Sequence, residues 1–366
     1  MRLTKTLSGY IARHFIAGCG GVFMAMITIT FLLDYLELIR RGGAKSDATL
    51  GLLFEMALLK LPHMAQEVMP FAILFGTMVT FWRLTRSNEL VIARAAGISV
   101  WQFLMPAVIF AVLIGVVAVT VFNPVASAMQ ASYESLDNRV LRGGGDQLAV
   151  FRTGVWLRES DAQGNHSMIH ADRIEQDHDI VLQNVTIFFF TGMNRFSGRL
   201  DAATARLESG KWHVLNGSYW REDHPSEPFE TMDIPTGLTG RKIQESFASP
   251  ETMSFWQLPG FIRLLQESGF STQRHRLYFN ALLARPFLFC AMVLIAATFS
   301  LRMQRRGGTT LMISGGVASG FLLYFLSDVV FALGLSSTIP VTLAAWTPAG
   351  ICLLIGTTLL LHLEDG

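Results

Sequence analysis

Charged residues are scarce in this sequence. Only 16% of its 366 residues are Asp, Glu, Lys or Arg, whereas soluble domains contain about 25%. Hydrophobic residues make up 51% of the chain, and the mean hydropathy is +0.40. The formal net charge of +1 excludes a general electrostatic attraction to nucleic acid. The composition therefore predicts a membrane protein.

Cysteines are also few. The three present, Cys19, Cys290 and Cys352, all lie in apolar runs, so they imply no disulfide framework. A domain of the size expected here folds without disulfides, and the cysteine content therefore fits any redox compartment.

Several motifs for chemistry are missing. The chain has no GxxxxGK[ST] phosphate loop, because an alanine separates glycine from lysine in residues 42–46 (GGAKS). It has no HExxH and no GxSxG motif either. His166, His170 and His178 fall among predicted strands, where exposed strand histidines are favoured over a zinc site. The sequence therefore predicts no catalytic residues, no metal site and no cofactor held by this chain.

The chain has instead six long apolar runs. Each is long enough to cross a hydrocarbon core of about 30 Å as a helix. Their approximate bounds are Phe15–Leu38, Leu50–Trp82, Val100–Phe122, Leu277–Leu301, Leu311–Leu333 and Val341–Leu361. No cleavage site follows the first run, which predicts an uncleaved span. The second run is polar from Glu55 to Glu67, so this half either projects beyond the hydrocarbon or faces a protein interior.

Between the third and fourth runs the pattern changes to short β-type segments separated by turn residues. These segments are Leu148–Phe151, Val155–Arg158, Met168–Ile174, Ile180–Phe190, Ala205–Leu207, Trp212–Leu215 and Phe229–Ile234. Residues 161–165 and 208–211 are expected to form hairpin turns. Short strands at this spacing favour an antiparallel sandwich or jelly roll. A short helix is expected to follow at residues 254–269.

Basic residues in the short loops predict the orientation of the spans. They gather before the first span, after the second and after the fourth, at Arg2, Lys5, Arg13, Arg83, Arg86, Arg94, Arg302, Arg305 and Arg306. With these segments in the cytoplasm, both termini lie inside and the β domain lies outside. We therefore predict a polytopic α-helical membrane protein with six transmembrane helices and an inserted all-β, jelly-roll-like domain. The expected divisions are 1–140, 141–250 and 251–366.

Residues Ser87–Gly97 are expected to form a separate short helix on the cytoplasmic side. Ser87 is a favourable N-cap, and Glu89 would interact well with the positive end of the helix dipole. Gly97 is typical of the position after a helix C-terminus. Two interpretations are open: an interfacial turn helix, or a helix that docks into a partner at the membrane surface.

Several basic residues break the orientation rule because they fall on the outer side. They are Arg40, Arg41, Lys45, Arg139 and Arg142. One interpretation is local pairing with acidic neighbours, at Asp34, Glu37, Asp47 and Asp137. The other is recognition of an anionic ligand, since guanidinium groups bind phosphate in a bidentate fork. Arg285 also lies within an apolar run, where an ionised group suggests a cavity or an interface.

Several stretches resemble the LptF/LptG permease family, and the resemblance covers essentially the whole chain. The plan of three spans, an extracytoplasmic β domain and three more spans is that of the family. Residues 61–76 contain LP followed by PFAILFG, similar to the family's LP and PxAxLxG pattern. Ser87–Gly97 resembles its SELxxxRAxG coupling segment, with Asn88 standing between the serine and the glutamate. Residues 33–41, 154–158 and 202–206 look like the LptG branch.

The resemblance implies a function and a set of partners. The family forms the membrane half of an ABC transporter that extracts lipopolysaccharide from the bacterial inner membrane. An LptF-like permease would pair with this chain, an LptB-like ATPase dimer would use the ATP, and LptC-like and LptA-like proteins would continue a periplasmic β track. On this basis the chain is a multi-pass transport subunit, not an enzyme, and it does not bind nucleic acid.

The resemblance also assigns candidate residues. The segment that contacts the ATPase would contain Arg86, Ser87, Asn88, Glu89 and Arg94. The basic positions that contact the lipid would be Arg40, Arg41, Arg139 and Arg142. Asp34 departs from the family, which often has a basic residue there, so lipid contact through the first span is in question below Arg40.

The mechanistic hypothesis is that ATPase closure moves the Ser87–Gly97 helix, and that the second and third spans transmit the motion to a lipid cavity. The strand Ile187–Phe190 either guides acyl chains or forms ordinary domain core. One alternative function is a mechanotransmission-type ABC permease that carries no lipid, against which the outer arginines argue. The other is a membrane-anchored scaffold or enzyme without an ATPase, against which the capped cytoplasmic helix argues.

Overall fold

The structure is a computed structural model. It describes residues 5–43, 49–141, 147–151, 154–160, 166–176, 180–191, 195–208, 210–221, 224–237, 249–267, 271–301 and 308–365. The chain divides into two compact units. The first contains residues 1–136, 251–256 and 273–366, and the second contains residues 137–250 and 257–272.

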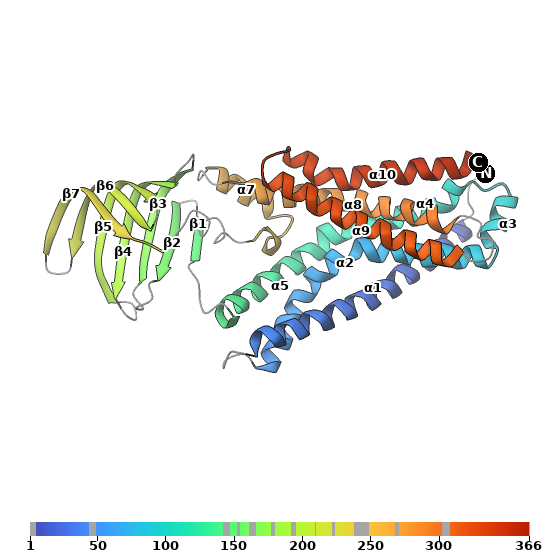
Figure 1. The fold of residues 1–366 in the computed structure, drawn as a ribbon, viewed down its shortest axis with the longest axis horizontal. Helices are drawn as coiled ribbons and strands as arrows, with labels where there is room; N and C mark the ends of the chain where they lie inside the picture. The colour runs from blue at the N-terminus through green and yellow to red at the C-terminus, as the bar shows by residue number, and fades with distance from the viewer. Residues whose placement is uncertain are drawn as a thin grey trace. The chain divides into compact units, whose positions relative to one another are not determined.

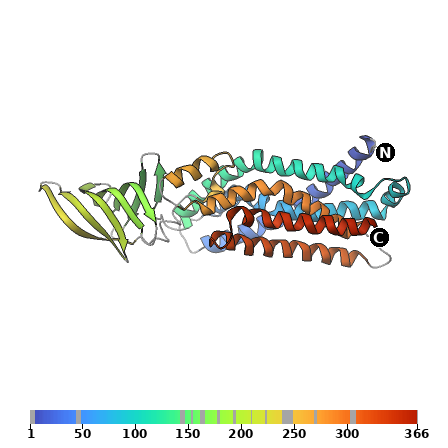
Figure 2. The same ribbon diagram turned by 90° about the horizontal axis from the view of Figure 1, so that it is seen from above.

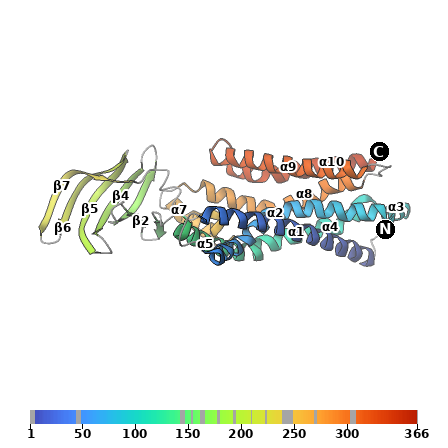
Figure 3. The ribbon, with the colours of Figure 1, turned by 60° about the horizontal axis from the view of Figure 1, so that its bottom comes forward.

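The first unit is a bundle of long helices (Figure 1). Its helices are α1 (Lys5–Gly42), α2 (Leu50–Arg86), α3 (Glu89–Ala95), α4 (Val100–Val117), η1 (Ala118–Phe122), α5 (Asn123–Leu136), α8 (Gln273–Ser300), α9 (Gly308–Leu335) and α10 (Val341–Asp365). Helix α1 begins and α10 ends at the end of the bundle that carries α3 (Figure 2). Helices α9 and α10 run side by side (Figure 3).

The predicted six spans are confirmed. Among the described residues, six helical segments are long and apolar enough to cross a membrane. They are Thr6–Gly42, Leu50–Arg86, Val100–Leu141, Gln273–Ser300, Ser314–Leu335 and Val341–His362.

The third span continues through a proline by way of a π-helical turn. Pro124 has no backbone N–H, so the carbonyl four residues earlier, that of Thr120, lacks its usual helical partner. The indole Nε1–H of Trp256 donates to that carbonyl at 3.1 Å. The backbone N–H of Phe255 donates to the side-chain oxygen of Asn123 at 2.8 Å. The segment before α8 therefore completes the hydrogen bonding at this irregular turn, which is a common site for π-helix.

Glycines allow the helices of the bundle to pack closely. A Cβ added to Gly76 on α2 would lie 2.4 Å from the Cα of Cys19 on α1. Two glycines of α9 lie against α2: a Cβ on Gly316 would lie 2.4 Å from the sulfur of Met78, and one on Gly320 would lie 3.4 Å from the Phe71 ring. The pair therefore packs α9 against α2 of the same chain.

The second unit is a seven-stranded antiparallel sheet with one helix against it. The elements are η2 (Asp137–Leu141), β1 (Gln147–Phe151), β2 (Gly154–Ser160), β3 (His166–Gln176), β4 (Ile180–Thr191), β5 (Arg195–Glu208), β6 (Lys211–Arg221), β7 (His224–Pro235) and α7 (Leu258–Glu267). A short 3-10 turn, η3 (Pro250–Thr252), precedes α7 in the chain.

The sheet confirms the inserted antiparallel β domain and specifies its connectivity. The described strands pair in chain order from β1 to β7, so they form a meander and do not make the Greek-key crossings of a jelly roll. The predicted hairpin turn at 208–211 is present, since Glu208 pairs with Lys211 and Gly210 has a φ of +81°. The expected turn at 161–165 lies outside the described residues.

One face of the sheet forms the core of this unit. Ile187, Leu200 and Trp212 are buried there, and Leu265 of α7 packs against them. Because side chains alternate along a strand, Phe189 packs with this core, while Phe188 and Phe190 lie on the opposite face. Ile187 and Phe189 thus serve as domain core, which is the simpler of the two interpretations of this strand.

Candidate functional site

The segment predicted to contact an ATPase is a short helix joined to α2 by a two-residue turn. Ser87 follows the last residue of α2, and its backbone N–H donates to the carbonyl of Arg83 at 3.0 Å. Asn88 has a φ of +60°, and its carbonyl accepts from the N–H of Ile92 at 3.1 Å. The prediction that Ser87 is the N-cap of the short helix is wrong: Ser87 is the C-cap of α2.

The insertion of Asn88 has a structural reason. The turn between the two helices needs a residue in the left-handed region, and asparagine tolerates that region better than most residues. The helix therefore extends over Glu89–Ala95 instead of the expected 87–97.

Polar contacts hold Glu89 at the start of α3. The Ser87 hydroxyl donates to the Glu89 carboxylate at 2.9 Å and lies 3.2 Å from the carbonyl of Leu84. The Tyr10 hydroxyl of α1 is also hydrogen-bonded to Glu89. Glu89 is half-buried as a result, and its carboxylate links α3 to α1 and to the end of α2.

The C-terminus of α3 confirms the predicted role of Gly97. Its φ is +81°, and the N–H of Ile98 donates to the carbonyl of Ala93 at 3.1 Å, which is the pattern of a Schellman cap. On the helix itself, Leu90 is 3% exposed and packs in the bundle core, whereas Ile92 is 67% exposed. The side chain of Arg94 lies outside the described part of the chain.

Basic side chains of α2 border α3. Arg83 and Arg86 are exposed in the last turn of α2, and the Arg86 guanidinium lies 5.3 Å from the centre of the Trp82 ring. Arg86, Ser87, Asn88 and Glu89 thus form one continuous surface segment. Beside it, Ile92 presents an exposed apolar side chain that motif matching alone did not single out.

The predicted lipid-contacting residues lie elsewhere. The Arg40 side chain is 79% exposed and pairs with Glu37 at 2.8 Å, a contact that the local-pairing interpretation expects and that leaves most of the guanidinium accessible. Arg41 is exposed on the same last turn of α1. Arg139 is exposed in η2 of the second unit. Arg142 and Lys45 lie outside the described residues.

Asp34 is balanced by a lysine of the neighbouring helix. The Lys60 ammonium of α2 lies 2.5 Å from the Asp34 carboxylate and 5.5 Å from the centre of the Tyr133 ring. Within the polar half of α2, Lys60 and His63 therefore face the bundle, whereas Glu55 and Glu67 are exposed. The pairing also removes the local negative charge that Asp34 would otherwise bring to α1.

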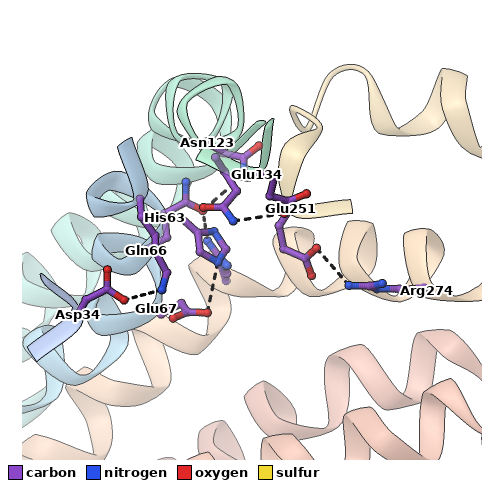
Figure 4. Close-up of polar contacts among 11 residues, drawn as sticks. Asp34, His63, Gln66, Glu67, Asn123, Glu134, Glu251 and Arg274 are labelled. Carbon is purple, nitrogen blue, oxygen red and sulfur yellow. Dashed lines mark hydrogen bonds and ion pairs between the residues drawn. The ribbon is translucent and has the colours of Figure 1, made fainter. Parts of the chain in front are cut away.

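A second polar group joins α2, α5 and α8 (Figure 4). Arg285 of α8 donates to the side-chain oxygen of Gln66 at 2.5 Å, and the amide of Asn123 lies 3.4 Å from the same oxygen. His63 and Glu67 lie 3.5 Å apart on α2. Gln66 is only 2% exposed. The sequence pointed to Arg285 but missed Gln66 and Asn123, because neutral amides in apolar runs give little pattern.

A groove of about 800 Å³ lies between α1 and α4 near the α3 end of the bundle. Its lining is mostly apolar and comprises Ser8, Gly9, Ala12, Arg13, Ile16, Ala17, Met105, Pro106, Ile109 and Phe110. Farther along α1, Met24, Ile29, Leu32 and Leu33 are also exposed. Apolar side chains on this scale are suited to lipid or to another membrane helix.

The described residues show no cluster of three His, Cys, Asp or Glu side chains suited to a metal ion. His166 instead stacks on Phe190 with ring centres 4.9 Å apart, and His170 contacts Trp156 at 4.5 Å. His178 lies outside the described residues.

These features define a polytopic helical membrane protein with an inserted antiparallel β domain and a short capped helix at one end of its bundle. A family model described as "Lipopolysaccharide export system permease LptF/LptG" matches residues 9–362, and the chain belongs to that family. It is 22% identical over 362 residues to the Lipopolysaccharide export system permease protein LptG of Escherichia coli (strain K12), covering 97% of this chain and 98% of the relative. It is 23% identical over 365 residues to the protein of the same name from Haemophilus influenzae (strain ATCC 51907 / DSM 11121 / KW20 / Rd), covering 95% and 96%.

Proposed function

We propose that this chain is an LptG-type subunit of an ABC transporter that extracts lipopolysaccharide from the bacterial inner membrane. A separate LptB-like ATPase dimer supplies the energy, an LptF-like chain completes the membrane part, and LptC-like and LptA-like proteins receive the lipid in the periplasm. The cytoplasmic side is the one that carries α3 and both termini. The similarity to LptG proteins over nearly the full length supports this proposal.

The observation that carries the proposed ATPase contact is the structure of α3. It is a capped helix of seven residues, fixed to α2 through a two-residue turn and anchored by Leu90. Its Ile92 side chain is exposed, and an exposed apolar residue beside charged ones is typical of an interface core with a polar rim. A force on this helix acts directly on α2.

Copurification tests this contact. Glu89→Lys combined with Ile92→Asp removes both the carboxylate and the apolar contact, so the LptB-like ATPase should no longer copurify with the tagged chain. Glu227→Lys is the matched control, because it reverses the charge of an exposed glutamate in β7 and should leave recovery unchanged. Full recovery of the ATPase by the double variant would refute the role of α3.

The proposed lipid contact has a separate test. Arg40→Glu with Arg41→Glu should reduce photo-crosslinking to lipopolysaccharide while the ATPase still copurifies, because reversed charges repel the phosphates. Unchanged crosslinking would refute a role for these arginines. If the ATPase binds but no lipopolysaccharide crosslinks to the native chain, the mechanotransmission alternative is favoured instead.

A further inference from the structure

An aromatic surface covers part of the sheet face opposite the core of the β domain. Trp156 and Phe188 are stacked with ring centres 6.4 Å apart and planes 9° apart. Phe196 contacts Phe188 at 6.4 Å and stacks on Trp220 at 5.7 Å. These four rings, here named the aromatic platform, come from β2, β4, β5 and β6, so the platform crosses the sheet.

The platform is not part of the hydrophobic core. Strand alternation places Phe188 opposite Ile187, and Trp220 opposite Tyr219, which both pack on the core face. The pairing of β4 with β5 is irregular after Phe189, and the ring contacts of Phe196 with Phe188 and Trp220 place it on the platform side. Phe196 is 36% exposed and Trp220 is 40% exposed. Cross-strand aromatic pairs stabilise a sheet, and a row of large aromatic side chains at the surface is also typical of binding sites.

A shallow polar hollow of about 550 Å³ adjoins the platform. His170, Thr186, Asp201 and Ser218 line it and follow one another in register across β3, β4, β5 and β6. His170 also pairs with Trp156 of the platform. The hollow and the platform therefore lie on the same face and meet at this row.

The polar groups of the hollow are fixed in place. The Asp201 carboxylate accepts from the Thr186 hydroxyl at 2.8 Å and from the Arg199 guanidinium at 2.8 and 3.0 Å. Arg199 in turn lies 5.7 Å from the centre of the Phe188 ring. Within the hollow, Asn184 and Asn216 have φ values of +51° and +53°. Such left-handed residues inside strands are uncommon and are often found at functional sites.

We propose that this face binds a saccharide, namely the sugar chain of the exported lipopolysaccharide. Sugar rings present flat C–H faces that rest on aromatic rings, and hydroxyl groups that pair with carboxylate, amide, hydroxyl and imidazole side chains. The Arg199 charge is balanced by Asp201, so the face suits a neutral, hydroxyl-rich ligand better than a phosphate. In the described part of this face, the hollow is shallow and polar, which does not suit acyl chains. The assignment to this cargo rests on the proposed function.

The test uses the full-length chain in nanodiscs and a lipid-free core oligosaccharide released from lipopolysaccharide by mild acid. Tryptophan fluorescence and saturation-transfer NMR measure its binding. Trp220→Ala should weaken binding by about fivefold or more, since one stacking contact is lost. Trp220→Tyr, which keeps an aromatic ring, should stay within about twofold of the native chain. Thr231→Ala, an exposed position on β7, is the control and should bind normally.

The outcomes separate this inference from the proposed function. Absent oligosaccharide binding, or equal binding by Trp220→Ala, overturns the saccharide site. Crosslinking of intact lipopolysaccharide to the helical unit would then still support the proposed function. If a photo-crosslinker at Phe196 captures a protein and no saccharide, the face is a protein interface and the inference is likewise refuted. Loss of both oligosaccharide binding and lipopolysaccharide crosslinking overturns both proposals.

Discussion

Replacement of Gly97 by alanine should weaken ATPase binding by α3 and leave the stability of the bundle unchanged. Gly97 has a φ of +81°, and this left-handed conformation costs a residue with a Cβ about 1–2 kcal/mol. No atom lies within 4 Å of a Cβ added there, so the substitution causes no clash and acts through the backbone alone. That energy corresponds to a change of about 5–30-fold in the ratio of capped to frayed helix.

The effect should reach ATPase binding because α3 is short. A helix of seven residues is far below the length of about 12–15 residues that is marginally stable alone. Affinity falls with the fraction of α3 that is correctly formed, so Gly97→Ala should weaken the complex by up to about 30-fold. The thermal midpoint of the isolated chain should not change, because the bundle core is not touched.

Microscale thermophoresis of the nanodisc-embedded chain with the LptB-like ATPase measures this affinity. Gly97→Asn is the matched control, since asparagine tolerates the left-handed region and should retain most of the affinity. Native affinity for Gly97→Ala would refute the argument that the Schellman cap holds the binding helix. A large drop in the thermal midpoint would refute the claim that the effect is local.

Three further predictions concern stability. Gln66→Leu removes the acceptor of Arg285 and should destabilise the bundle by about 3 kcal/mol, measured by unfolding in mixed micelles. Gln66→Glu keeps an acceptor and should destabilise the bundle less. Equal loss of stability in both variants would refute the argument. Gly76→Leu forces a side chain into the backbone of Cys19 and should lower the thermal midpoint, whereas Gly20→Leu, with no atom within 4 Å, should not. The Lys211 ammonium holds the pKa of Asp233 below its usual value. The ion pair therefore stabilises the pairing of β6 with β7 at pH values above the unfolded carboxyl pKa of about 3.9. This contribution is lost as the pH falls through the folded pKa of Asp233. Asp233→Asn should therefore flatten the acid dependence of Trp212 fluorescence, and an unchanged acid limb would contradict the pairing.

The spans could be predicted from the sequence because the physical requirement is simple. A run of about 20 apolar residues is sufficient to cross a bilayer, and all six runs became helices. The strands were predicted at too short a length in places. Strand β5 extends over Arg195–Glu208, although only Ala205–Leu207 was expected. Its outer face carries polar side chains such as Arg199 and Asp201. Without knowledge of the neighbouring strands, a sequence with this many polar residues looks like a loop.

The site was predictable where it depends on local geometry and not where it depends on contacts between helices. Gly97 could be assigned because a left-handed cap favours glycine. The error at Ser87 arose because serine is common in the turns at both ends of a helix, and the left-handed Asn88 shifts the boundary. The Lys60–Asp34 pair spans 26 residues of sequence. The Arg285–Gln66 pair spans 219. No periodicity within one helix indicates which residue of another helix lies opposite.

Gln66 lies in a part of α2 where two prolines remove backbone hydrogen bonds of the helix. Pro70 has no backbone N–H, so the carbonyl of Gln66, four residues earlier, loses its usual helical partner. Pro62 has the same effect about two turns before Pro70. The side-chain bonds of Gln66 to Arg285 and Asn123 therefore brace α2 between its two prolines. On the proposed function, a displacement of α3 passes along α2 to this braced segment, and we expect changes at Gln66 to alter how far it spreads without altering ATPase affinity at α3.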